Sequence, residues 1–266
     1  MAKSQLGPGS ALREFLTGAG LLGRGLGLVL RNPRLLGLGL LPALLAGLLY
    51  AAALVALVVF VDDLAGAVTW FADDWSSPWR GAVRFGAGAA LLGLGALLGV
   101  LTFTAVTLLI GDPFYEKISG VVESRYGGVP DEVEVPLLRS LGRSLRDSLR
   151  LIGLSILFAI PLFLAGFLPV VGQTVVPVVG GAIGGWLLAV ELTGVPFQRR
   201  DKRLRDRRQA LAGRRPLTLG FGVAVFLCFL IPLGAVLLMP AAVAGAALLS
   251  RKVLGLPTEI VTTSPL

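Results

Sequence analysis

Residues 169–197, PVVGQTVVPVVGGAIGGWLLAVELTGVPF, combine a proline-bracketed turn with an apolar run in which the first charged residue is Glu191. The turn contains Gly172, Gln173 and Thr174, so the chain reverses where a water-facing loop and a continuous helix are both disfavoured. In lipid, each unpaired amide or carbonyl group of such a turn costs several kcal/mol. The stretch therefore predicts a hairpin that dips into a bilayer and packs against protein.

The composition predicts an all-α integral membrane protein that forms a single domain over residues 1–266. Hydrophobic residues make up 55% of the chain, charged residues only 15%, and the mean hydropathy is +0.83. The sequence has no histidine, which removes the usual general base and most zinc or iron sites. We therefore expect no enzyme activity, no metal site and no cofactor.

The charge distribution predicts a lipid partner. The net charge is +8, but the basic residues flank apolar runs and have no interleaved aromatic residues on which bases could stack. Anionic lipid headgroups are therefore the expected partner, and nucleic acid is not.

Two long charge-free runs predict transmembrane spans at residues 35–61 and 85–111. The first has 27 residues, which at ~1.5 Å per residue is enough to cross a ~30 Å hydrocarbon layer with some tilt. Residues 1–34 are basic and predict an interfacial helix, while the loop between the spans is acidic and rich in tryptophan. Because positive charge favours the cytoplasmic side, the N-terminus is expected there. Small residues in the second span, including the pair Gly95 and Gly99, predict close contact with another helix.

Residues 112–150 predict two amphipathic helices. Asp112 is the expected N-cap of the first, with Pro113 at the first helical position. Its apolar face excludes Glu123, and the pair Gly127 and Gly128 ends it. The second carries a basic stripe that is expected to lie along the cytoplasmic lipid surface and consists of Arg139, Arg143, Arg146 and Arg150.

Two proline-broken hairpins follow, at 151–190 and 217–250, separated by the strongly basic segment 198–215. Seven residues separate the turn prolines in each, Pro169 from Pro177 and Pro232 from Pro240. Such a repeat of broken apolar segments indicates a transport site at the repeat interface. Both hairpins begin and end beside positive charge, which favours re-entrant hairpins, although four ordinary spans would give the same charge pattern.

Several of these motifs resemble the CysZ sulfate-permease family, which also groups with the eukaryotic etoposide-induced membrane proteins. The similarity covers roughly residues 12–254 and is carried by GQTVVPVV, VPF, LTLGFG, IPLGAVLLMPAAVAGA, GDPFYEKISGVVE and NPRLLGLGLLP. The resemblance implies two long spans, two half-penetrating hairpins, a homo-oligomer and sulfate uptake for cysteine synthesis across the bacterial cell membrane. Relatives tend to carry a glycine, an aliphatic residue and an arginine pair after the first proline, whereas this chain has Arg34 followed by leucines. Either Arg34, a single arginine displaced from the position of that pair, binds the substrate in this chain, or the substrate is a different one.

A sulfate site needs N–H donors and positive charge, and both occur at helix N-termini. The first candidate is Arg34 with Leu35, at the start of the first span; the alternative for Arg34 is an interfacial anchor. The second is the turn Gly172, Gln173 and Thr174, whose polar groups either contact substrate or satisfy the turn's own backbone.

The carboxylates have separate interpretations. The charge of Asp112 would repel an anion, which favours the N-cap role, even though the helix starting at Pro113 is a third candidate N-terminus. Glu191 is either a proton-coupling carboxylate or a partner in an interfacial salt bridge. The leading functional hypothesis is uptake of sulfate or a related oxyanion. The alternative is a non-transporting membrane-shaping or scaffold protein that inserts wedge-like hairpins.

Overall fold

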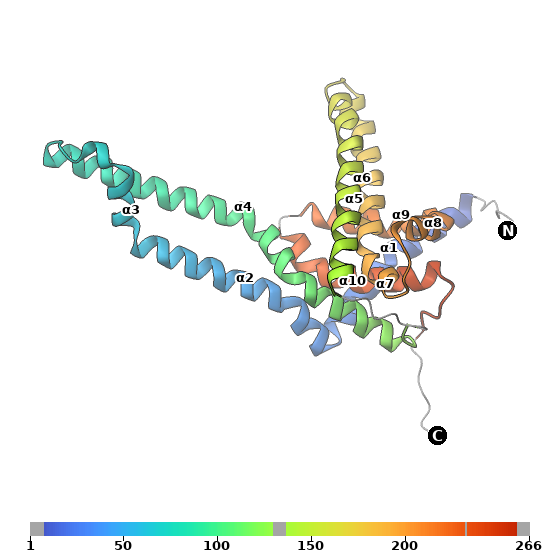
Figure 1. Cartoon of the computed structure of the whole chain (residues 1–266). Coiled ribbons are helices and arrows are strands. Elements are labelled where there is room, and N and C mark those ends of the chain that lie inside the picture. The colour runs from blue at the N-terminus through green and yellow to red at the C-terminus, as the bar shows by residue number, and fades with distance from the viewer. Residues whose placement is uncertain (1–7, 130–136, 232, 260–266) are drawn as a thin grey trace. The chain divides into compact units, whose positions relative to one another are not determined.

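The computed structural model describes residues 8–129, 137–231 and 233–259, and every regular element in these ranges is a helix (Figure 1). Side chains are described for 9–129, 149–231 and 233–259. Five of the described helices are long and apolar enough to cross a membrane. The predicted class, an all-α integral membrane protein, is confirmed.

The chain divides into two compact units. The two-helix unit is Leu40–Asp112, and the core unit comprises Met1–Gly39 and Pro113–Leu266. The arms of the two-helix unit belong to α2, Pro33–Val59, and α4, Ser77–Arg125. Two short helices, α3 at Val61–Val68 and η1 at Trp70–Ala72, join the arms, so the predicted acidic loop is partly helical.

Within the two-helix unit, glycines of α4 face large side chains of α2. A Cβ atom added at Gly95 would overlap the Leu57 side chain, and one at Gly99 would lie 3.5 Å from the Tyr50 ring. The Tyr50 and Thr102 hydroxyls form a 2.6 Å hydrogen bond. The close helix contact predicted from the small residues is therefore confirmed at these positions.

α4 contradicts the predicted helix start at Asp112. It is one helix of 49 residues that passes through both Asp112 and Pro113, so Asp112 is not an N-cap. An interior proline removes one intrahelical hydrogen bond, but the residues on both sides still favour helix, and α4 continues past it. Its end was predicted correctly: α4 stops at Arg125, ahead of Gly127 and Gly128, whose φ angles are 98° and 74°.

A single helix, α5 at Leu137–Gly166, contains both the end of the predicted amphipathic region and the first arm of the first hairpin. The predicted boundary at residues 150 and 151 does not exist, because no helix-breaking residue occurs there. Residues 130–136, between the two predicted amphipathic helices, and the stripe side chains Arg139, Arg143 and Arg146 lie outside the described part of the chain.

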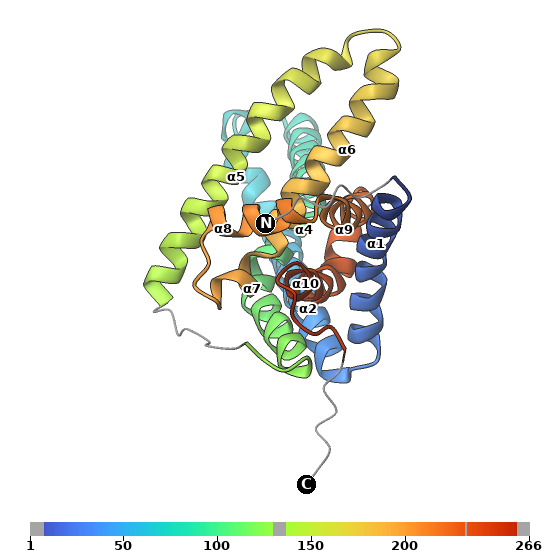
Figure 2. The same cartoon turned by 90° about the vertical axis from the view of Figure 1, so that its right-hand side faces the viewer.

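The core unit is built around α10, Gly234–Val253 (Figure 2). α1, Pro8–Leu30, packs against α10 and against α9, Arg215–Phe229. A Cβ atom added at Gly25 would lie 2.7 Å from the backbone nitrogen of Gly245, so the α1–α10 contact requires a glycine. The predicted N-terminal helix therefore exists and has a buried, protein-facing side.

Both predicted hairpins are helix–turn–helix units, α5 with α6, Val171–Leu192, and α9 with α10. Each turn contains one non-glycine residue with positive φ, Val170 at 67° and Leu233 at 61°, in each case the residue that follows the first turn proline of the repeat. The two hairpins differ in burial. In the most apolar 18-residue segment of each helix, 6% of the residues are buried in α5 and 22% in α6, against 78% in α10. The turns thus repeat, but α10 is buried along most of its length, whereas the buried residues of α6 are confined to its C-terminal part, from Gly185 onward.

Two short helices link the hairpins, α7 at Gly194–Gln198 and α8 at Leu204–Gly213. α8 meets α9 at a bend of 106°. α9 has 15 residues and spans about 22 Å, less than the ~30 Å hydrocarbon layer. Its length fits the predicted short arm, while re-entry of the hairpins remains a prediction.

Candidate functional site

The first predicted site lies at the start of α2. Arg34 is exposed, and its backbone N–H donates a 3.2 Å hydrogen bond to Oδ1 of Asn32. The Leu35 side chain is fully buried, so only its backbone could meet a substrate. At this helix start, the Arg34 guanidinium is therefore the group best placed for an anion.

The second predicted site lies in the first turn of α6, which begins at Val171, so the prediction that Gly172, Gln173 and Thr174 form the turn of the hairpin is wrong. The Thr174 hydroxyl donates to the carbonyl oxygen of Val170 at 2.6 Å. The backbone N–H groups of Gly172 and Thr174 donate to the carbonyl oxygens of Leu168 and Val170, at 2.8 and 3.0 Å. Because sulfate only accepts hydrogen bonds, Thr174 has no hydroxyl proton left for it. The structure favours the alternative that Thr174 satisfies the local backbone, here at the start of α6, and Gln173 is the exposed polar side chain that remains.

These two predicted sites do not meet. The start of α2 and the α5–α6 turn lie at opposite ends of the core unit in both views (Figures 1 and 2). Glu191 is exposed in the last turn of α6, where it lines a pocket with Ser155 and Phe226. Asp112 belongs to the two-helix unit. Within the core unit, the structure therefore does not bring the start of α2 and the start of α6 together into one site.

A buried ion cluster, Glu123 with Arg200 and Arg251, was not predicted. Nη1 and Nη2 of Arg200 donate to the two Glu123 carboxylate oxygens at 2.8 Å each, and Nη1 of Arg251 donates to Oε2 at 2.7 Å. The side-chain exposures of Glu123, Arg200 and Arg251 are 1%, 7% and 2%. Two guanidinium groups share one carboxylate, which leaves one net positive charge inside the protein.

Backbone carbonyl groups accept further hydrogen bonds from this cluster. Nη1 of Arg200 donates to the carbonyl oxygen of Pro196 at 2.7 Å. Arg251 donates from Nε to Pro257 and from Nη1 to Gly128, at 2.8 Å each, and from Nη2 to Tyr126. Such bonds offset the large cost of removing ions from water. The cluster thus ties together the ends of α4 and α10 and the segment around α7.

The prediction that Glu123 lies away from the buried face of its helix is wrong. Tyr115, Ser119 and Glu123 occur at four-residue intervals and are 5%, 0% and 1% exposed, so they share one buried face. This spacing was visible in the sequence. The two arginine partners, 77 and 128 positions away, were not.

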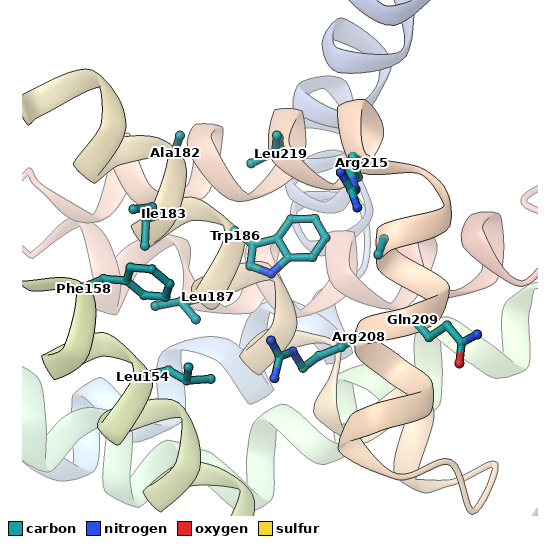
Figure 3. A pocket seen from close by; sticks show the side chains of 11 residues that line it. Leu154, Phe158, Ala182, Ile183, Trp186, Leu187, Arg208, Gln209, Arg215 and Leu219 are labelled. Carbon is teal, nitrogen blue, oxygen red and sulfur yellow. The ribbon is translucent and has the colours of Figure 1, made fainter. Parts of the chain in front are cut away.

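An arginine-lined pocket lies among α5, α6, α8 and α9 (Figure 3). Its volume is about 620 Å³, and it contains Trp186 between an apolar wall and two exposed arginines, Arg208 and Arg215. Arg208 lies on α8 at the edge of the face that buries Leu204 and Leu211, and its side chain is exposed. This concentration of positive charge was predicted for the segment as a whole, but the pocket was not.

Comparison with known proteins agrees with the membrane fold. The chain is 29% identical over 146 residues to the Sulfate transporter CysZ of Pectobacterium atrosepticum. This match covers 54% of the chain and 53% of the relative. The chain is also 33% identical over 150 residues to the Sulfate transporter CysZ of Pseudomonas fluorescens. This match covers 55% of the chain and 60% of the relative. The matched part thus spans little more than half the length of these relatives. A family model, Sulfate transporter CysZ/Etoposide-induced protein 2.4, matches residues 21–240, and the chain therefore belongs to this family.

Proposed function

We propose that this protein mediates uptake of sulfate or a related oxyanion across a bacterial inner membrane and thereby feeds cysteine synthesis. The observation that carries the proposal is the family match over residues 21–240, which includes both long helices and most of both hairpins. The two relatives are named as sulfate transporters. The five long apolar helices support the multi-pass membrane location on which transport depends.

The proposed substrate contacts are Arg34, at the start of α2, and Gln173, in the first turn of α6. Both side chains are exposed and both carry N–H donors, which an oxyanion requires. The backbone N–H of Leu35 would contribute beside Arg34, whereas the N–H of Gly172, also predicted to bind substrate, already donates to the carbonyl oxygen of Leu168. Glu191 is the proposed coupling carboxylate, because it combines an ionisable group with an otherwise largely apolar pocket.

The proposed topology has a cytoplasmic N-terminus and two re-entrant hairpins. It is supported by the positive charge at the base of both hairpins and by the acidic residues of the α2–α4 connection. The exposed apolar side chains of α5 and α6 need lipid or another protein to cover them. Anionic lipid and further copies of the chain are the proposed partners.

Growth on low sulfate tests the proposal in a bacterial strain that lacks sulfate uptake. We expect the wild-type chain to restore growth and Arg34→Ala to restore it less well. Arg13→Ala is a matched control, because Arg13 is an exposed cation on α1 outside the proposed contacts, and it should behave as wild type. No growth with the wild-type chain present in the membrane would contradict the proposal.

The second candidate function, membrane shaping, is favoured by one observation. Few residues in the arms of the first hairpin are buried, 6% of the apolar segment of α5 and 22% of that of α6, as a membrane-inserting wedge requires. This function predicts that the purified protein changes the shape of liposomes and that sulfate does not raise its melting temperature. Thermal stabilisation by sulfate but not by chloride, without liposome remodelling, would exclude it.

A further inference from the structure

Three adjoining pockets form one groove along α5, α6, α8 and α9. A pocket of about 500 Å³ at the charged end shares Leu154 and Arg208 with the pocket around Trp186. The latter shares Phe158, Ile183 and Leu187 with a third pocket, of about 460 Å³. The groove is therefore continuous from α8 towards the turns of the hairpins.

The polarity of the groove changes along its length. Four exposed arginines line its first two pockets: Arg150, Arg205, Arg208 and Arg215. Around Trp186, Arg208 and Arg215 lie on one side and Phe158 and Leu187 on the other (Figure 3). The third pocket is lined mainly by aliphatic and aromatic side chains, and Glu191 is the one acid among the described lining residues of all three. A basic end thus leads into an apolar channel.

The groove follows the membrane-spanning part of α5. Arg150 is the last charged residue before the apolar run that begins at Leu151, so it marks the charged end of this part of α5. Leu154, Phe158 and Leu162 follow at four-residue intervals on one face and line the groove. From Arg150 to Leu162 the helix rises about 18 Å, close to the ~15 Å half-thickness of a hydrocarbon core.

We infer that this groove binds one anionic phospholipid, with the headgroup phosphate at Arg208 and Arg215 and an acyl chain along α5. Guanidinium groups bind phosphate through paired, charge-assisted hydrogen bonds, and basic pockets between membrane helices are suited to lipid headgroups. A free sulfate or phosphate ion would occupy the basic end alone and leave the apolar channel unfilled. Only an anion with a long apolar tail matches both ends of the groove.

The fluorescence of Trp186 provides a direct test, because this side chain lies inside the groove. The full-length protein carries Trp70→Phe, Trp75→Phe and Trp79→Phe, which leaves Trp186 as its one tryptophan. It is reconstituted into phosphatidylcholine vesicles that contain a small fraction of lipid with brominated acyl chains, either phosphatidylglycerol or phosphatidylcholine. We expect at least twofold stronger quenching by the brominated phosphatidylglycerol.

Charge variants and competition separate the possible occupants. Arg208→Gln combined with Arg215→Gln should remove the excess quenching, while Arg208→Lys should keep most of it. Arg13→Gln combined with Lys202→Gln is the matched control, since both residues are exposed outside the groove, and it should change nothing. Equal quenching by the two brominated lipids, or unchanged quenching in the Arg208 and Arg215 variant, would overturn the proposal. Loss of the excess in sulfate but not in chloride of equal ionic strength would also overturn it and identify a small-anion site.

Discussion

The Arg251 guanidinium donates a 2.7 Å hydrogen bond to the Glu123 carboxylate, although the two residues are 128 positions apart and only 2% and 1% exposed. Arg200 binds the same carboxylate with both of its terminal nitrogens. Because Glu123 lies at the end of α4 and Arg251 at the end of α10, one carboxylate connects helices from distant parts of the sequence.

Glu123→Gln should strongly destabilise the protein. The variant keeps the size of the side chain but leaves two buried guanidinium groups without a counter-charge, at a cost of roughly 3–5 kcal/mol. A thermal melt of the purified protein in detergent measures the effect. The control is Asp73→Asn, which breaks the Arg84–Asp73 pair, whose side chains are 43% and 56% exposed, and should cost no more than about 1 kcal/mol. Equal melting temperatures for Glu123→Gln and wild type would show that the cluster does not stabilise the fold.

Two glycines on α1 should respond in opposite ways to the same substitution. Gly25→Ala places a methyl group against the backbone of α10, 2.7 Å from the nitrogen of Gly245, and should cost about 1–3 kcal/mol. Gly23→Ala has no atom within 4 Å of the new Cβ, and alanine favours helix, so its stability should equal or slightly exceed that of wild type. Thermal melts of both variants check this pair, and comparable losses in both would argue against the α1–α10 contact.

Although the turn of the first hairpin was placed too late, inside α6, the sequence was sufficient to predict the membrane class, two long apolar helices, the glycine end of α4 and the presence of two helical hairpins. These features depend on local patterns of hydropathy and on proline and glycine. It was insufficient at Asp112, where a local capping pattern was outweighed by helix continuing on both sides of Pro113. It also missed the partners of Glu123, because they come from α10 and the α7 region, and no local pattern links such distant segments.

Gln173→Leu should impair sulfate uptake, whereas Thr174→Val should not. Gln173 is exposed with donors that an anion can use, but the Thr174 hydroxyl already donates to Val170. We expect Gln173→Leu to raise the KM for sulfate several-fold and Thr174→Val to change it less than twofold. Initial uptake rates over a range of sulfate concentrations give both values. A large rise in KM for Thr174→Val with an unchanged maximal rate would show instead that the Thr174 hydroxyl contacts the substrate.

Cysteine labelling tests whether the hairpins are re-entrant. In a Cys228→Ser background, which removes the one native cysteine, Gln173→Cys and Leu237→Cys place single thiols near the two turns. Leu237 is 65% exposed, whereas the adjacent Val236 is only 6% exposed and would resist labelling in any topology. Re-entrant hairpins predict that an impermeant reagent outside intact cells does not label either thiol.

Trp79→Cys in the same background is the positive control, because Trp79 is 68% exposed and lies in the segment predicted to face outward. It should be labelled from outside. Rapid labelling of Gln173→Cys under the same conditions would show that α5 and α6 are full spans.

Transport of radiolabelled sulfate into vesicles that contain only the purified protein tests the central claim most directly. The account predicts saturable uptake above that of empty vesicles and a clear reduction in Arg34→Ala, with Arg13→Ala unchanged. Uptake equal to that of empty vesicles, at every pH and membrane potential applied and with the protein correctly inserted, would contradict it.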